Sequence, residues 1–244
     1  MQTQNIKQNI KQNLKPRLKP TTKLIGADQQ AVVLITGFAP FDKDPINSSW
    51  DVAQAFSSVE IPGAKLVVRQ LPSEFNRSIE VLESHLKKFK PGLIISLGQA
   101  NTRNEISVER VAININDARI ADNAGAKPID TQVVSKAPVG YFSSLPIKAI
   151  VKAMRQAGIP ASVSQTAGTY VCNHLFFGLM HLLATQSSGA RGGFLHLPPL
   201  PSQAARLPGL SSLALQTMVD AVHIAIVTSL KRTKDIRLSA GKID

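Results

Sequence analysis

The single cysteine of the chain, Cys172, is the residue best suited to nucleophilic chemistry. It follows a short apolar segment that ends at Ser164 and a glycine turn at Gly168, and leucines and phenylalanines at helical spacing come after it, so we expect it in the first turn of a helix. The helix dipole and the free backbone N–H groups of a first turn favour negative charge. Cys172 is therefore a candidate nucleophile, and the alternative of a small buried hydrophobic residue fits this stretch equally well.

A nucleophilic thiol needs a base within hydrogen-bond reach, and the chain has five histidines. His196 ends an expected strand at 192–197, at the carboxyl edge of a sheet where open α/β sites gather, which makes it the predicted base. His174 is two positions beyond Cys172 on the same helix and should face away from the thiol. The remaining three occupy mid-helix or distant helical positions: His85, His181 and His223.

Glu109 is the candidate for the acid that orients the base. It stands in a mostly apolar, strand-like segment at 106–114, where a carboxylate is costly to bury unless it is paired. Two interpretations are equally consistent with the sequence: Glu109 pairs with the histidine, or it forms a structural salt bridge with Arg110 or Arg103.

Composition limits the class of protein. At 244 residues the chain is long enough for one large domain plus a tail. A total of 28 Lys and Arg against 16 Asp and Glu gives a net charge of +12, so a nucleic-acid partner has to be considered. Six of these basic residues lie before residue 30, and no basic cluster is interleaved with aromatic residues, so nucleic acid is not the expected partner.

Residues 1–30 read as a separate basic tail of low complexity with a four-residue repeat of the Gln-Asn-Ile-Lys type. Its Asn, Gln and Pro content predicts disorder, and it lacks the apolar stretch of a secretory signal. A single cysteine excludes an internal disulfide and a cysteine-based zinc site, and no apolar run reaches membrane-spanning length. These features predict a cytoplasmic protein without a membrane span.

Alternating strand and helix signals predict an α/β fold: a single three-layer domain with a mainly parallel twisted sheet and helices on both faces. Domain boundaries are expected at residues 31–244. Between 116 and 140 we expect loop and short hairpin pieces, and near Glu109 and Arg110 an irregularity in a strand at 106–115. The other expected strands are 31–36, 65–71, 93–97, 161–164 and 192–197. One helix is expected to begin after Ser48 or Ser49, one to run from Ser73 to 89, one from 145 to 158, one to begin near Cys172, and the last to run from 207 to 230.

Three separated segments and a histidine segment carry a combined pattern. They are Gly37-Phe38-x-Pro40-Phe41, Gly98-Gln99-Ala100 with Ile106-Ser107-x-Glu109-Arg110-x-Ala112-x-Asn114, Ser164-x-x-Ala167-Gly168-x-Tyr170-Val171-Cys172-Asn173, and Leu195-His196-Leu197-Pro198. In this order they resemble the pyroglutamyl peptidase I family, also called pyrrolidone-carboxylate peptidases, which are cysteine exopeptidases. The resemblance covers roughly residues 32–230. It departs at Asp42 and Lys43, where family members commonly have glycines, and at Pro199, where an aromatic residue is common.

The resemblance implies a catalytic triad of Cys172, His196 and Glu109, the same residues that position and burial cost favour. It also implies that four side chains line a pocket for the pyrrolidone ring, that the Gln99 backbone holds the lactam and that Arg119 lies near the site. Aromatic walls with a few backbone hydrogen bonds suit a flat, uncharged ring. The four pocket residues are Phe38, Phe41, Tyr170 and Val171.

The predicted function is removal of N-terminal pyroglutamate from peptides, with no metal and no cofactor. The resemblance also implies a homo-oligomer, with a tetramer as the candidate size. Two alternatives from other classes stay open. One is an inactive relative that binds modified peptide N-termini, and the other is a nucleic-acid binder that works through the basic tail.

Overall fold

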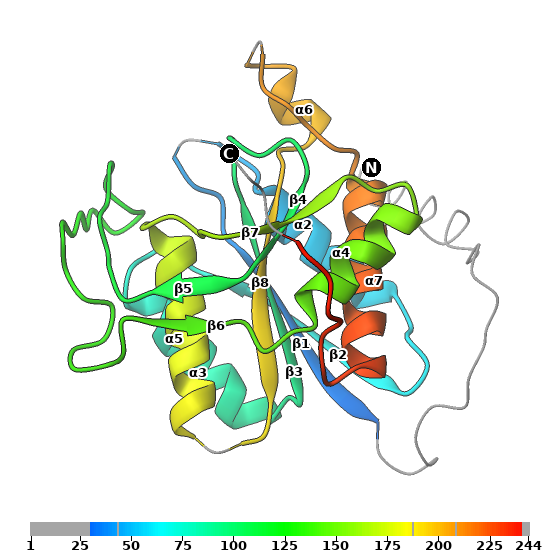
Figure 1. The fold of residues 1–244 in the computed structure, drawn as a ribbon. Helices are drawn as coiled ribbons and strands as arrows, with labels where there is room; N and C mark the ends of the chain where they lie inside the picture. The colour runs from blue at the N-terminus through cyan, green and yellow to red at the C-terminus, as the bar shows by residue number, and fades with distance from the viewer. Residues whose placement is uncertain (1–29, 43, 187, 208, 241–244) are drawn as a thin grey trace.

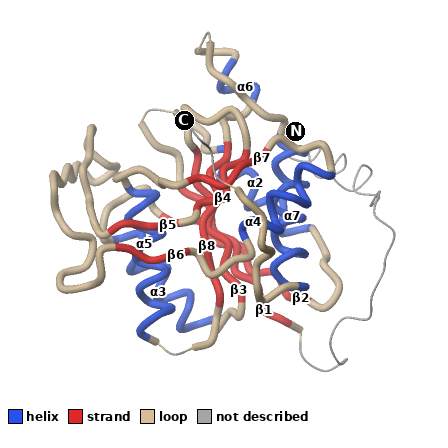
Figure 2. Tube along the Cα trace, in the orientation of Figure 1, coloured by secondary structure: helices blue, strands red, loops and turns tan. Residues whose placement is uncertain are grey.

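The computed structural model describes residues 30–42, 44–186, 188–207 and 209–240. The predicted tail falls outside this range except for Gln30. The centre of the fold is a six-stranded sheet, drawn red in Figure 2. Its strands follow one another in the order β2 (Ala64–Leu71), β1 (Ala31–Phe38), β3 (Leu93–Gln99), β8 (Arg191–Leu197), β4 (Ile106–Glu109) and β7 (Ala161–Ser164).

The sheet is mainly parallel, as predicted. Strands β2, β1, β3 and β8 are parallel to one another. Strands β4 and β7 are parallel to each other, and β4 is antiparallel to β8. The carboxyl ends of β1, β3 and β8 therefore meet at one edge of the sheet, where β8 ends beside β3 and across from the start of β4.

Helices cover both faces of the sheet (Figure 1). Helices α2 (Ser48–Ala55), α4 (Ile147–Gln156) and α7 (Leu215–Lys231) pack on one face, and α3 (Arg77–Phe89) and α5 (Val171–Thr185) pack on the other. This is the predicted three-layer α/β domain. Within the described residues no helix is both long and apolar enough to cross a membrane.

The period of two along each strand explains why both faces are apolar. Val33 and Ile35 of β1 point into the core under α2 and α7, and Leu34 between them points into the core under α3 and α5. All three are fully buried, and each such side chain contributes about 1.5 to 3 kcal/mol. A continuous apolar run is therefore required for a strand that is covered on both sides.

Several predicted boundaries differ in the structure. The N-cap of α2 is Asn47, whose side chain accepts from the Ser49 N–H, rather than Ser48 or Ser49. Helix α3 begins at Arg77 rather than after Ser73, because the Ser73 hydroxyl donates to the Ala39 carbonyl instead of capping a helix.

The last helix begins at Leu215 rather than at residue 207. Gly209 has a φ of 84°, which a right-handed helix cannot contain, and the chain before it forms only the short α6 (Pro201–Ala204).

The irregularity predicted near Arg110 is present: β4 ends at Glu109, and β5 (Val111–Ile113) leaves the main sheet. It pairs with β6 (Gly140–Phe142), a strand that the sequence did not indicate.

Candidate active site

Strand pairing places the predicted base and acid on the same face of the sheet. Ser107 of β4 lies opposite His196 of β8, and Glu109, two residues further along β4, points to the same face as Ser107. Glu109 is thus a diagonal neighbour of His196, within reach of a long side chain. This antiparallel contact between β4 and β8 is the element that brings the two residues together.

His196 and Glu109 form a buried hydrogen-bonded pair. The His196 Nδ1 lies 2.8 Å from Glu109 Oε1, and the two residues are 5% and 0% exposed. The competing salt bridges are not formed, since Arg110 donates to the Ala240 carbonyl and Arg103 donates to Ser164 and to the Thr166 carbonyl. Because Nδ1 faces the carboxylate, Nε2 is left for the thiol.

The charge of His196 is set by opposing effects. Burial lowers its pKa, but the charge of Cys172, a hydrogen bond with Cys172, and the hydrogen bond and charge of Glu109 raise it, and together they bring the pKa to about 9. His196 is therefore an imidazolium at neutral pH, flanked by a thiol on one side and a carboxylate on the other.

Cys172 is the second residue of α5, and Tyr170 is the N-cap. The helix packs on the sheet face that carries Glu109 and His196, so its first turn faces the pair. Gly98 makes room for the thiol: a Cβ at this position would lie 2.9 Å from Cys172 Sγ and 2.7 Å from Phe194 Cζ. Gly98 is also the register partner of His196, so the thiol lies over the β3 position next to the strand residue that carries the imidazole.

A pocket of about 690 Å³ opens beside the thiol at the carboxyl edge of the sheet. Cys172 lies in its wall, while Glu109 and His196 are buried behind it. The four side chains predicted to line the pocket do so, and Gln99 and Arg119, predicted at the lactam and near the site, line it as well. These six residues come from four separate parts of the chain: Phe38, Phe41, Gln99, Arg119, Tyr170 and Val171.

Aromatic side chains form one wall of this pocket. The Phe41 and Tyr170 rings lie 5.4 Å apart, and the Tyr170 hydroxyl donates to the Ala121 carbonyl at 3.0 Å. Burial and the charges of Asp122, Asp42 and Cys172 raise the pKa of Tyr170, so this wall stays uncharged. A flat, uncharged ring would fit beside it.

The pocket also has wall residues that sequence reasoning missed. Asp44 comes from the loop after β1, and Arg206 and Leu207 come from the segment after α6. Arg206 and Asp44 form an ion pair of 2.7 Å across the pocket mouth. The available signal was position, because both segments follow strands that end at this edge. Asp42, which stands where glycine is common, adopts a φ of 49° that favours glycine.

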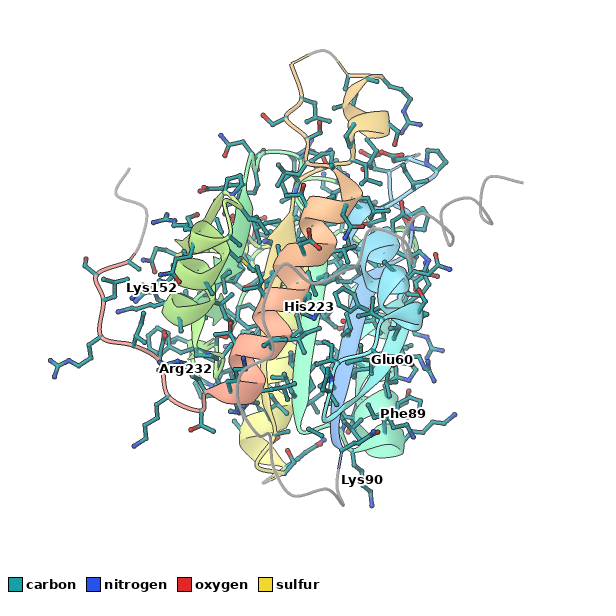
Figure 3. The ribbon with its side chains drawn as sticks, turned by 90° about the vertical axis from the view of Figure 1, so that its right-hand side faces the viewer. Glu60, Phe89, Lys90, Lys152, His223 and Arg232 are labelled. Carbon is teal, nitrogen blue, oxygen red and sulfur yellow. The ribbon has the colours of Figure 1, made fainter. Side chains whose placement is uncertain are left out.

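The other histidines lie away from the thiol. His223 is on α7, on the opposite face of the sheet, and is labelled in Figure 3. His85 is on α3, and His181 bonds to the Tyr141 hydroxyl. His174 is fully buried and contacts Asn116 and Asn76. Across the described part of the chain, no group of three or more His, Cys, Asp or Glu could hold a metal ion.

The α/β fold and a thiol at a helix start, facing a buried histidine and glutamate, define a cysteine-type peptidase. The family model described as pyroglutamyl peptidase matches residues 31–232. The chain is 55% identical over 212 residues to the pyrrolidone-carboxylate peptidase of Cupriavidus pinatubonensis, and 54% identical over 211 residues to pyrrolidone-carboxylate peptidase 1 of Ralstonia nicotianae. Each alignment covers 86% of this chain and 98% of the relative.

Solved structures agree with these relatives. The pyroglutamyl peptidase I of Bacillus amyloliquefaciens superposes with a TM-score of 0.84 at 41% identity, covering 86% of this chain and 100% of that one. The pyrrolidone carboxyl peptidase of Thermococcus litoralis superposes with a TM-score of 0.82 at 38% identity, covering 86% and 99%. The chain belongs to the pyroglutamyl peptidase family.

Proposed function

We propose that this protein removes N-terminal pyroglutamate from peptides through a covalent thioester, with Cys172, His196 and Glu109 as catalytic triad. The observation that carries the proposal is the buried His196–Glu109 pair, whose bond of 2.8 Å leaves Nε2 free beside a thiol in the wall of a pocket. Membership of the pyroglutamyl peptidase family supports the same substrate class.

The Cys172 thiolate attacks the carbonyl carbon of the pyroglutamyl residue, and a carbon–sulfur bond forms. The carbon–nitrogen bond then breaks, and the imidazolium of His196 gives its proton to the departing amine. Water, which loses a proton to His196, attacks the thioester and releases pyroglutamate and the free thiol. Glu109 holds the imidazole by Nδ1 and stabilises its charged form throughout.

Substrate recognition uses the pocket beside the thiol. Phe38, Phe41, Tyr170 and Val171 enclose the pyrrolidone ring, and the backbone of Gln99 bonds to the lactam. The oxyanion of the tetrahedral intermediate lies near the backbone N–H of Cys172 at the start of α5, where the helix dipole favours negative charge, and Arg119 assists from the pocket wall.

The test is release of a fluorogenic amine from its pyroglutamyl derivative. The wild-type protein is expected to release the amine, and Cys172→Ala is expected to abolish the release without changing the fold measured by circular dichroism. Cys172→Ala that keeps activity would exclude the triad. Wild-type protein that binds pyroglutamyl peptides without turnover would instead indicate an inactive relative.

The role of the basic tail, residues 1–30, is tested separately. A tail contribution predicts salt-sensitive binding of DNA or RNA that disappears when residues 1–30 are deleted, while peptidase activity persists. Equal binding by the full and shortened chains would discard the tail as a nucleic-acid binder.

We also propose a homo-oligomer, for which a tetramer is the candidate size. Two large apolar side chains at strand β6 support an interface there, since Val139, just before the strand, is 91% exposed and Phe142, at its end, is 72% exposed. Light scattering at several protein concentrations measures the mass directly. Phe142→Lys is expected to lower that mass, and a wild-type protein that stays monomeric would refute the assembly.

A further inference from the structure

His174 is a fully buried histidine, two residues beyond Cys172, that the proposed mechanism does not use. Its Nε2 lies 2.8 Å from the backbone nitrogen of Asn76, and its Nδ1 lies 2.9 Å from Asn116 Oδ1. Because a backbone N–H can only donate, Nε2 is the acceptor, and Nδ1 carries the proton that it donates to Asn116. Burial lowers the pKa of His174 to about 4, against a raising effect of Asp122, so the ring is neutral at physiological pH.

The two hydrogen bonds of His174 connect it, directly or through neighbouring residues, to both ends of the segment 117–121. Asn116 stands just before residues 117–121, and Asp122 stands just after them. The Asp122 Oδ2 accepts from the backbone N–H of Phe75 at 2.7 Å, and Phe75 is next to Asn76. His174 therefore connects both ends of this segment: it holds Asn116 directly, and Asp122 through the turn at Phe75 and Asn76.

The segment 117–121 forms part of the pocket wall. Arg119 and Ile120 line the pocket, and the Ala121 carbonyl accepts from the Tyr170 hydroxyl at 3.0 Å. The Asp117 backbone N–H donates to the Thr169 carbonyl at 2.9 Å. These bonds tie the segment to the Tyr170 hydroxyl and to the residue that precedes Tyr170.

The turn at Asn76 is strained, which indicates that it is held in place by its surroundings. Asn76 has a φ of 57° and a ψ of −55°, and the Arg77 N–H donates to the Phe75 carbonyl across it, which makes a tight three-residue turn with positive φ. Such turns persist when neighbouring groups over-determine them. Here the neighbouring group is His174, which accepts the Asn76 N–H.

Aromatic packing joins the same residues to the pocket. The Phe75 ring lies edge-on to the His174 ring at 5.2 Å and edge-on to the Tyr170 ring at 5.3 Å. A displacement of His174 would thus be passed to Tyr170 both through Phe75 and through the hydrogen-bonded segment.

We propose that His174 is a positioning residue that fixes the 117–121 segment and Tyr170 against the helix that carries Cys172. The inference rests on the proposed function, because the wall it positions is the wall expected to hold the pyrrolidone ring. Loss of the two hydrogen bonds loosens substrate binding while the thiol, His196 and Glu109 keep their places, since none of them contacts His174 by a hydrogen bond in the described residues.

The test compares His174→Phe with His181→Phe, the same change about two helical turns further along α5, where the histidine side chain bonds only to the Tyr141 hydroxyl. For the fluorogenic pyroglutamyl substrate, His174→Phe is expected to raise KM by about tenfold or more and to change kcat by less than about threefold. The alkylation rate of Cys172 by iodoacetamide stays at the wild-type value in both variants. His181→Phe keeps the wild-type KM.

Two conservative variants separate positioning from general stability. His174→Asn keeps a donor near Asn116, and His174→Gln keeps an acceptor that reaches the Asn76 N–H. Each is expected to give a KM between those of the wild type and His174→Phe. A variant series that lowers kcat and leaves KM unchanged would overturn the proposal.

Hydrogen exchange gives a readout that does not need activity. Amides in residues 117–122 are expected to exchange faster in His174→Phe than in the wild type or in His181→Phe. If the wild-type protein has no peptidase activity, the proposed function fails, yet this comparison still decides the positioning role. Unchanged exchange in residues 117–122 of His174→Phe would refute it.

Discussion

At the scale of single residues, the bond between His196 and Glu109 determines how the site responds to pH. Cys172 and Glu109 raise the pKa of His196 from its ordinary value near 6.5 to about 9, against the lowering effect of burial. The imidazolium is therefore present at neutral pH and is lost as the pH rises through about 9. Because the proposed leaving amine takes its proton from this imidazolium, kcat/KM is expected to fall in the same alkaline range.

Glu109→Gln isolates the charge from the geometry. A glutamine can still accept from Nδ1, but it lacks the negative charge that favours the imidazolium, so the alkaline fall of kcat/KM is expected about one pH unit lower than in the wild type. The maximal kcat is expected to drop by about a hundredfold. A profile of kcat/KM from pH 5 to pH 10 measures both effects.

The matched control is Glu105→Gln, a change of the same kind four residues earlier, just before β4. Its profile is expected to overlay the wild-type profile. If Glu109→Gln kept the wild-type alkaline midpoint, the charge of Glu109 would have no part in setting the state of His196.

The sequence and its resemblance predicted which side chains lie together in the site, but they did not predict all the hydrogen bonds that hold these side chains in place. A lone cysteine before a helical pattern, a histidine at a strand end and a costly glutamate made Cys172, His196 and Glu109 candidates, and the family resemblance selected the three together. Sequence could not decide between His196 and an arginine as the partner of Glu109, because that choice depends on the antiparallel register of β4 and β8. It also gave no sign of His174 as a link, since its partners lie 58 and 98 residues away.

At the scale of elements, β3 contributes to the site by lacking a side chain. Gly98→Ala would place a Cβ within 2.9 Å of Cys172 Sγ and 2.7 Å of the Phe194 ring, closer than real Cβ atoms approach. The thiol has to move, so kcat/KM is expected to fall by at least about a hundredfold, because small misplacements of reacting groups are costly. Gly92→Ala, where a Cβ meets nothing within 4 Å, is expected to retain wild-type kinetics.

Steady-state kinetics of the two alanine variants gives the comparison, with iodoacetamide alkylation of Cys172 as a second measure. An active Gly98→Ala with normal alkylation would mean that the close approach of β3 and α5 is not needed for catalysis.

Helix α4 depends on a residue distant in sequence for its N-terminal cap. Asp235 accepts from the Lys148 N–H at 2.9 Å and from the Ala149 N–H at 3.0 Å, and no side chain of the helix's own N-cap, Pro146, can do so. Asp235→Ala is expected to lower the free energy of unfolding by about 1 kcal/mol. Urea denaturation measures this change, and Lys234→Ala serves as the neighbouring control with an expected effect near zero.

Element boundaries were the least predictable part of the fold. The pattern of apolar residues located every strand of the main sheet, and it was clearest for β1 and β3, whose burial on two faces requires an almost continuous apolar run. Ser73 was misassigned as a helix cap because its hydroxyl bonds to Ala39, 34 residues earlier, which no local pattern reveals. Strand β6 was missed because three residues that pair only with β5 bury too little surface to impose a pattern.

At the scale of the whole molecule, the pocket mouth is assembled from three segments that a single buried side chain joins. Gln203, which is 1% exposed, donates to Asp44 Oδ2 at 2.8 Å and to Gln99 Oε1 at 3.0 Å, and it accepts from the Leu200 N–H at 2.8 Å. The loop after β1, the end of β3 and the segment after β8 are thereby fixed relative to one another. All the hydrogen-bonding atoms of the Gln203 amide thus have a partner.

Gln203→Met keeps the length of the side chain but leaves a partly exposed carboxylate oxygen of Asp44 and the Leu200 backbone N–H without this partner, so the free energy of unfolding is expected to fall by about 1 to 3 kcal/mol. The mouth should also widen, because Asp44 then loses its link to the buried Gln203 and keeps only the exposed Arg206 and the Ile46 N–H of its own loop as partners. KM for the pyroglutamyl substrate is expected to rise by about fivefold with little change in kcat. Gln216→Met, at an exposed position on α7, is the matched control for both measurements. If Gln203→Met lost stability but kept the wild-type KM, the hydrogen bonds of Gln203 would stabilise the fold without shaping the pocket.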